Sequence, residues 1–169
     1  MPSAAIRALV LDVDGVLTDN RLHVDILQNE SKSFCIADGL GLKLWTAVGL
    51  KVAVISGHGS LQAQHRMKKL GIDEVHLGVL DKLPVYEALL ARWGVAPESV
   101  AVVGDDLPDL PLLRRCGFAA TVPAAHAEVK AMAQHITVLQ GGHGAVREIV
   151  ELLLHRNGLW DAATAPFRK

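Results

Sequence analysis

Carboxylates crowd the end of the first apolar run in this chain. In the stretch ALVLDVDGVLTD, residues 8–19, four apolar residues run directly into Asp12 and Asp14. A second acidic group follows a later apolar run and consists of Asp105, Asp106 and Asp109. Two like charges about 4 Å apart repel by on the order of 4 kcal/mol at an effective dielectric constant near 20. Carboxylates that meet in a fold therefore need a cation between them, and oxygen-rich groups of this kind suit magnesium.

Two further residues could complete a site for a phosphoryl group. Ser56 ends another apolar run, and Lys82 follows a third run and opens a helical pattern. The oxygens of a transferring phosphoryl group need positive charge and hydrogen-bond donors, which magnesium, a lysine and a serine supply. One carboxylate can attack phosphorus in line, and a second, when protonated, can donate to the leaving oxygen. These residue types therefore favour metal-dependent phosphoryl transfer.

Such a site needs a scaffold that brings the ends of distant strands to one edge. Apolar runs of strand length predict strands at Ile6–Leu11, Val52–Ile55, Glu74–Leu77, Val100–Val103, Gly117–Val122 and Ile136–Leu139. Helical spacing predicts helices at Leu40–Val48, Leu61–Leu70, from near Asp81 to Trp93, and at Leu107–Arg115, Ala125–Ala133 and Ala145–His155. The alternation predicts an α/β fold, a three-layer Rossmann-like parallel sheet with helices on both faces. Ligands bind at the carboxyl ends of the strands in such a sheet, where the acidic residues would gather.

Two segments depart from this alternation of strands and helices. Residues 21–36 alternate apolar and polar types around a break at Gln28-Asn29-Glu30, which predicts a projecting β-hairpin. The C-terminal tail, residues 157–169, contains Trp160 and Phe167, and these aromatic residues suggest that it docks on another surface. No repeat or linker interrupts the pattern, and 169 residues suit one domain, so residues 1–169 are expected to form a single domain.

Composition and charge narrow the class of function. A formal net charge of −1 provides no basic field for nucleic acid or for an anionic membrane, so neither is an expected partner. The apolar runs are too short to span a bilayer, and Asp12 interrupts the first before it could serve as a signal peptide. Cys35 and Cys116 match no metal-binding spacing and are expected to be reduced thiols. We expect a soluble, cytoplasmic protein.

The acidic motifs, the serine and the lysine resemble the signature of the haloacid dehalogenase superfamily in their order and at their strand ends. The matching stretches are DVDGVLT, Ser56-Gly57, Lys82 and GDD-x-x-D. The resemblance implies that Asp12 is a nucleophile that forms an aspartyl-phosphate and that Asp14 is the general acid/base. It also implies that Ser56 binds the phosphate and that Lys82 stabilises its charge.

The same resemblance implies a magnesium site. Asp12, Asp105 and the backbone carbonyl of Asp14 would hold the Mg²⁺ ion. Asp109 would orient Lys82 or the surroundings of the metal, and Asp106 would lie beside it, although an Asp at this position also suits the N-cap of the helix that follows.

Nearly the whole chain is similar to one family within this superfamily, the capless 3-deoxy-D-manno-octulosonate 8-phosphate phosphatases. The similarity is carried by the hairpin, by F-x-x-x-DG-x-G from Phe34, by GVLDKL and by GG-x-GAVRE from Gly141, and the gaps between the signature motifs leave no room for a cap domain. It implies a sugar-acid phosphate as substrate, hydrolysed in lipopolysaccharide synthesis. It also implies a homotetramer in which neighbouring subunits cover the active sites.

The family's substrate contacts carry over to Asp14, Cys35, Ile36, Ala37, Asp38, Gly39, Lys43, His58, Arg66 and Lys82. The sequence departs from the family at Ala37, His58 and His143, where an arginine is common, and Lys43 also replaces a frequent arginine. An arginine fork grips a carboxylate in a bidentate manner that alanine and neutral histidine cannot reproduce. A nonulosonate 9-phosphate, a nine-carbon sugar-acid phosphate, is therefore the alternative substrate.

A phosphoacceptor receiver domain is the non-enzymatic alternative, because it also combines an α/β fold with an acidic site, a hydroxyl residue and a lysine. The phosphorylated Asp of such a domain lies at the end of a middle strand. In this chain that strand ends in Ser56-Gly57, which offers no acceptor carboxylate.

Overall fold

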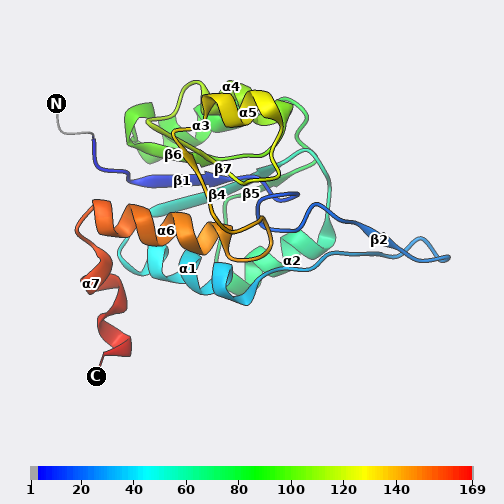
Figure 1. Ribbon diagram of the computed structural model, residues 1–169, viewed down its shortest axis with the longest axis horizontal. Coiled ribbons are helices and arrows are strands. Elements are labelled where there is room, and N and C mark those ends of the chain that lie inside the picture. The colour runs from blue at the N-terminus through cyan, green and yellow to red at the C-terminus, as the bar shows by residue number, and fades with distance from the viewer. Residues whose placement is uncertain (1–3, 169) are drawn as a thin grey trace.

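The computed structural model describes residues 4–168 and places a six-stranded parallel sheet at the centre of the molecule (Figure 1). The strand order is β5-β4-β1-β6-β7-β8. The strands are β1 (Ala8–Leu11), β4 (Lys51–Ser56), β5 (Val75–Leu77), β6 (Val100–Val103), β7 (Phe118–Thr121) and β8 (His135–Ile136). Leu11 is level with Val54 on one side and with Val103 on the other, so the residues after these three strands emerge together at one edge.

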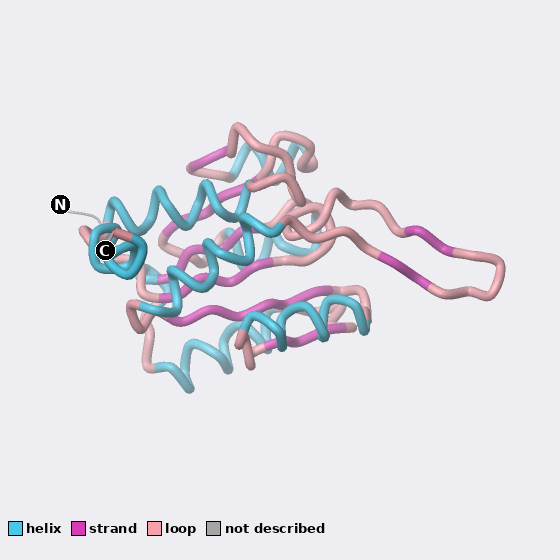
Figure 2. Tube along the Cα trace, turned by 90° about the horizontal axis from the view of Figure 1, so that it is seen from below, coloured by secondary structure: helices cyan, strands magenta, loops and turns pink. Residues whose placement is uncertain are grey.

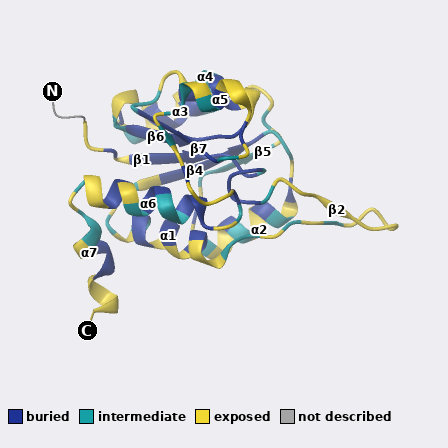
Figure 3. Ribbon diagram, viewed as in Figure 1, coloured by how far each residue is buried: buried dark blue, intermediate teal, exposed yellow. Residues whose placement is uncertain are grey.

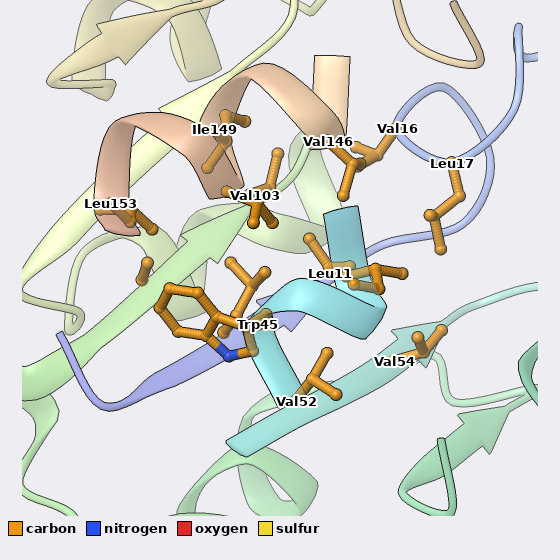
Figure 4. Close-up of a cluster of buried hydrophobic side chains, with 14 of the residues drawn as sticks. Leu11, Val16, Leu17, Trp45, Val52, Val54, Val103, Val146, Ile149 and Leu153 are labelled. Atoms are coloured by element: carbon orange, nitrogen blue, oxygen red, sulfur yellow. The ribbon is translucent and has the colours of Figure 1, made fainter. Parts of the chain in front are cut away.

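Helices cover both faces of the sheet, as the sequence predicted (Figure 1). One face carries α1 (Ile36–Ala47), α2 (Leu61–Leu70) and α6 (Ala145–Arg156), and the other carries α3 (Leu83–Trp93), α4 (Leu110–Leu113) and α5 (Ala127–Met132). Trp45 of α1 lies between the sheet and α6, and its indole N–H donates to the Lys51 carbonyl oxygen at 2.7 Å (Figure 4). The predicted three-layer α/β fold is confirmed.

Local signals explain where the helices begin and end. The Ser60 side chain caps α2 by accepting from the Ala63 N–H at 3.2 Å, and α2 stops at Gly71, whose φ of 75° favours glycine. Residues 107–115 form a short 3₁₀ turn followed by the brief helix α4, where one continuous helix was expected. Proline at positions 108 and 111 explains the break, because proline lacks the N–H that a helix interior needs.

The hairpin is present but shorter than predicted. Its strands β2 (His23–Val24) and β3 (Glu30–Ser31) project well beyond the sheet (Figure 2). The expected range of 21–36 was wrong at its end, because α1 begins at Ile36, four residues before the predicted helix. We call residues 21–35 the hairpin arm. Its tip exposes large apolar side chains, with Ile26 97% and Leu27 78% exposed (Figure 3).

The last predicted strand was also placed too late. Ile136–Leu139 was expected, whereas β8 ends at Ile136. The backbone N–H groups of Val138 and Leu139 donate instead to the carboxylate of Glu148 on α6, at 3.0 and 3.0 Å. A side-chain acceptor therefore replaces the strand partner that would have continued the ladder.

Residues 157–168 of the C-terminal tail contain a short helix and pack against the rest of the chain. Helix α7 (Trp160–Thr164) follows α6, and the Trp160 ring stacks on His155 with 4.7 Å between ring centroids. Asn157 pairs with the backbone of Ile6, just before β1, so the tail lies at the amino ends of the strands, opposite the hairpin arm (Figure 1). The predicted docking of the tail is intramolecular for Trp160, while Phe167 remains 68% exposed.

None of the helices within residues 4–168 combines the length and apolar character that crossing a bilayer requires.

Candidate active site

The carboxyl edge of the sheet gathers the residues that the motifs singled out. A cavity of about 200 Å³ opens there. Its lining comprises Asp12, Asp14, Asn20, Ser56, Gly57, His58, Lys82, Asp105, Asp106, Pro108 and Asp109. All the predicted catalytic and metal-binding residues are in this set. The structure thus brings together four chain segments that are far apart in the sequence.

Lys82 forms hydrogen bonds to both acidic groups of the site, the one after β1 and the one after β6. It occupies the N-cap position of α3 and is only 3% exposed. Its ammonium group donates to Asp12 Oδ1 at 2.7 Å and to Asp109 Oδ1 at 2.6 Å. Burial lowers the pKa of Lys82, but the two adjacent carboxylates outweigh this effect, so its pKa is raised and the side chain stays charged.

Asp109 also closes the loop that carries Asp105. Its Oδ2 accepts from the backbone N–H of Asp105 at 3.0 Å and of Asp106 at 3.3 Å. The Asp106 carboxylate in turn caps the turn that begins at Leu107, which confirms the capping interpretation of Asp106. A Cβ at Gly104 would lie 2.4 Å from the Asp109 Cβ, so this position requires glycine. The loop is thereby held rigidly by its own side chains.

Three buried carboxylates face one another in this arrangement. Oxygens of Asp12, Asp105 and Asp109 lie within 4.8 Å of one another. Burial, reinforced by the neighbouring carboxylates, raises the pKa of Asp105 to about 7. Burial and Asp109 raise that of Asp12 to about 6, even though Lys82 opposes the shift. Lys82 offsets one of the three negative charges, and the remaining two match one hard divalent cation with oxygen ligands.

Glycines let the loop after β1 approach this cluster. Gly15 has a φ of +88°, and a Cβ at Gly15 would lie 2.0 Å from Asp105 Oδ2. A Cβ at Gly141 would in turn lie 1.8 Å from the Gly15 carbonyl oxygen. The backbone N–H of Gly142 donates to the Val16 carbonyl at 3.1 Å. The glycine-rich segment before α6 therefore packs directly against the loop that follows β1.

Sequence reasoning missed Asn20, which lines the cavity, and Lys32, which contacts Asp14. Lys32 is the more deeply placed of the two at its side chain. Its side chain is 1% exposed, and its ammonium group lies 2.6 Å from Asp14 Oδ1 and 2.9 Å from His58 Nδ1. The only signal in the sequence was its position after the break in the hairpin pattern. A lysine in a short polar hairpin normally extends into solvent, so the pattern alone did not separate it from its neighbours.

The predicted substrate contacts divide into two groups. Asp14, His58 and Lys82 line the cavity, whereas the following residues do not: Cys35, Ile36, Ala37, Asp38, Gly39, Lys43 and Arg66. Asp38 is 1% exposed, and its Oδ1 accepts from the Arg147 N–H at 2.8 Å at the start of α6. Burial raises the pKa of Asp38, although backbone hydrogen bonds from α6 oppose the rise. Its carboxylate thus acts as a helix cap within this subunit.

The other residues of this second group lie at the N-cap of α1, along α1 as far as Lys43, and on α2. Arg66 packs over Gly39, where a Cβ would lie 2.5 Å from Arg66 Nη2, and donates to the Cys35 carbonyl at 3.4 Å. Ile36 is 83% exposed, and Ala37 and Lys43 are also exposed. Ile36, Ala37 and Lys43 are thus exposed residues of α1 that do not line the catalytic cavity.

Comparisons with known proteins agree with this geometry. The haloacid dehalogenase-like hydrolase family matches residues 72–149. The chain is 39% identical over 158 residues to the 3-deoxy-D-manno-octulosonate 8-phosphate phosphatase of Escherichia coli K12, covering 94% of this chain and 84% of that protein.

Two solved structures extend the likeness to the fold. The Moraxella catarrhalis 3-deoxy-D-manno-octulosonate 8-phosphate phosphatase, in complex with magnesium, phosphate and KDO, superposes with a TM-score of 0.93 at 37% identity, covering 97% of this chain and 94% of that one. The cobalt-bound Haemophilus influenzae enzyme superposes with a TM-score of 0.87 at 39% identity, covering 91% and 90%. Both are relatives along almost their full length.

Proposed function

Because the chain belongs to the 3-deoxy-D-manno-octulosonate 8-phosphate phosphatase family of haloacid dehalogenase-like hydrolases, we propose that it hydrolyses this sugar-acid phosphate. The products are the free sugar acid and phosphate, and the step serves lipopolysaccharide synthesis. The observation that carries the proposal is the buried cluster of Asp12, Asp105 and Asp109 around Lys82. This cluster combines a nucleophile, a metal site and a fixed cation in one cavity.

The metal of the proposed reaction is Mg²⁺, as in the Moraxella catarrhalis relative. Asp12, Asp105 and the backbone carbonyl of Asp14 would hold it, and the ion would supply positive charge to the phosphoryl oxygens. Lys82 adds a second cation, and the Ser56 hydroxyl offers a donor at the end of β4.

The chemistry then follows from the two aspartates of the first motif. A carboxylate oxygen of Asp12 forms a bond to phosphorus while the ester bond to the sugar oxygen breaks, and Asp14 gives its proton to that oxygen. The resulting aspartyl-phosphate is attacked by water, Asp14 takes the proton of this water, and Asp12 is released with free phosphate. Asp12 is oriented for attack by its hydrogen bond to Lys82.

A nonulosonate 9-phosphate is the second candidate substrate. His58 lines the cavity at a position where arginine is common in the family, and it is 41% exposed at the side chain. A neutral imidazole offers one donor where guanidinium offers a fork, so the grip on the substrate carboxylate differs.

Release of phosphate from the two substrates tests the proposal. The purified protein with magnesium is compared on 3-deoxy-D-manno-octulosonate 8-phosphate and on a nonulosonate 9-phosphate, with Asp12→Asn as the blank. We expect the eight-carbon substrate to have the higher kcat/KM. A higher value for the nine-carbon substrate would transfer the assignment to it, and activity equal to the blank on both would refute a phosphatase.

We also propose a homotetramer in which a neighbouring subunit covers each active site. Three observations support it. The hairpin arm exposes Val24, Ile26 and Leu27, the arm projects from the catalytic edge of the sheet, and seven predicted substrate contacts lie outside the cavity of their own subunit. Apolar side chains exposed on a projecting arm are typical of an interface.

Sedimentation at low protein concentration tests this assembly. The substitution Ile26→Glu should dissociate the tetramer and raise KM for the sugar phosphate, while p-nitrophenyl phosphate hydrolysis, which needs no sugar contacts, should persist. A monomeric unmodified protein with full activity on the sugar phosphate would contradict the proposal.

Two coarser proposals complete the assignment. We propose that the chain is one hydrolase domain without a cap, because the segment between Ser56 and Lys82 holds only α2 and β5. We propose a cytoplasmic location, because Cys35 and Cys116 are both free thiols, as a reducing compartment would keep them. Fractionation of cells that produce the protein would test the location.

A further inference from the structure

The Lys32 side chain is buried although Lys32 belongs to the hairpin arm. Ser31 and Ser33 on either side of it are exposed, so the alternation of an extended chain turns Lys32 inward. The arm is anchored at this point, because the Gln62 side chain on α2 donates to the Glu30 carbonyl at 2.5 Å. The lysine could reach solvent by extending along the arm, as long cationic side chains usually do. It reaches into the active site instead.

The groups that face the ammonium are specific. Its partners are Asp14 Oδ1 at 2.6 Å and His58 Nδ1 at 2.9 Å. An ammonium group has donors only, so it donates to both. Beyond them, Asp14 Oδ2 lies 3.9 Å from His58 Nδ1, and Glu30 Oε2 lies 3.9 Å from His58 Nε2. An ammonium group removed from water needs a compensating partner, and Asp14 is the carboxylate within hydrogen-bond reach.

We propose that Lys32 is the positioning residue for Asp14, the proposed general acid/base. Its hydrogen bond holds one oxygen of a carboxylate whose side chain is 27% exposed. Because Lys32 is carried by the hairpin arm and Gln62 anchors that arm, the orientation of Asp14 depends on the position of the arm. The element proposed to assemble the tetramer therefore also sets the acid/base of its own subunit. This inference rests on the proposed phosphatase function but not on the identity of the sugar.

A series of substituted phenyl phosphates tests the role, because their leaving groups differ in the need for a proton. We would measure kcat/KM with magnesium for the unmodified protein, Lys32→Met, Lys32→Arg and the surface control Lys68→Met. Without a positioned acid, kcat/KM should fall for substrates with poor leaving groups and should change little for p-nitrophenyl phosphate. For Lys32→Met we expect a loss of about 10–100-fold with phenyl phosphate, within the range for general acid catalysis, and less than about threefold with p-nitrophenyl phosphate. Lys32→Arg should recover part of the loss, and Lys68→Met should change nothing.

Comparison with Asp14→Asn separates positioning from other roles. The slope of log kcat/KM against leaving-group pKa should steepen in Lys32→Met as it does in Asp14→Asn, and the double variant should lose little more than Asp14→Asn alone. Gln62→Ala, which keeps both groups but releases the arm, should steepen the slope more weakly. This variant also tests the inference if Lys32→Met does not fold.

Three results would overturn the inference. These are an equal loss for every leaving group, a double variant whose losses multiply, and a rise in KM with an unchanged slope. The first two would indicate a structural or independent role, and the third would indicate a substrate-binding lysine. Activity on phenyl phosphates without activity on either sugar-acid phosphate would remove the substrate assignment and leave this test intact.

Discussion

The catalytic cavity and the surface beside the hairpin arm differ in how complete they are within one chain. Around Lys82 each partner is present, buried and hydrogen-bonded, and two negative charges remain for one metal ion. On the arm and on α1, apolar and cationic side chains face outward, as Ile26, Ile36 and Lys43 show. The residues of the catalytic cavity thus meet within one chain, whereas the exposed surface is where we propose that a second subunit contributes to recognition of the sugar.

Removing Asp12, the proposed nucleophile, should have the largest effect on the activity of the catalytic cavity. Asp12→Asn should lower magnesium-dependent phosphate release at least about 10⁴-fold, the order found when an enzyme loses its nucleophile. The loss should be equal for sugar-acid phosphates and for p-nitrophenyl phosphate, because both need the same attacking oxygen. Asp73→Asn, an exposed aspartate away from the cavity, is the control. An Asp12→Asn variant with more than about 1% of the activity would mean that another group attacks phosphorus.

Lys82→Met should break the cluster by leaving charge uncompensated. Asp12 and Asp109 would lose their shared cation while remaining buried, and breaking a buried ion pair costs about 3–5 kcal/mol. Denaturant unfolding without magnesium should show this loss, and added magnesium should recover part of it. Lys43→Met at the exposed surface should leave stability within about 0.5 kcal/mol. Equal stabilities for the two variants would show that the buried pairs do not hold the cavity together.

Magnesium should stabilise the protein in a pH-dependent way. Without metal, the pKa of Asp105 is about 7 and that of Asp12 about 6, above the unfolded value near 3.9. Because these pKa values are raised in the folded state, their contribution to the free energy of unfolding is fully present below about pH 4. It is lost as the pH rises through 6 and 7. Magnesium binds the ionised carboxylates, so its stabilisation should be small near pH 5 and complete near pH 8.

The expected gain at 100 times the dissociation constant is about 2.7 kcal/mol. Thermal unfolding at several pH values measures it, and Asp105→Asn should reduce it strongly. A gain that is independent of pH would place the bound magnesium away from these carboxylates.

Substitution of Asp38 should give the smallest effect. It tests whether Asp38 caps α6 or contacts the substrate. Loss of its cap on α6 in Asp38→Ala should cost about 1–2 kcal/mol, whereas Asp38→Asn keeps the acceptor oxygen and should cost a few tenths. Because the carboxylate is buried against α6, we expect KM for the sugar phosphate to stay unchanged in Asp38→Asn. A raised KM with normal stability would instead make Asp38 a substrate contact.

Much of the cavity could be predicted because its residues are tied to strand ends. Asp12, Ser56 and Asp105 follow apolar runs, and parallel strands in register bring such positions to one edge whatever the details of packing. The fold class was predictable for the same reason, since the alternation of strands and helices leaves few arrangements. Most errors lay at element ends, where side chains such as Glu148 replaced backbone partners, and one lay within residues 107–115, where prolines break the expected helix.

The sequence by itself therefore determined the chemistry of this protein. The reactive residue types stand at the ends of strands, and parallel strands bring these ends to one edge of the sheet. Only the tertiary structure decided which side of the arm Lys32 faces, which helix Asp38 caps and where the tail packs. These contacts join segments that are distant in the sequence, and they depend on the angle at which the arm and α6 meet the sheet. No local pattern encodes that angle, because it results from the packing of the whole core.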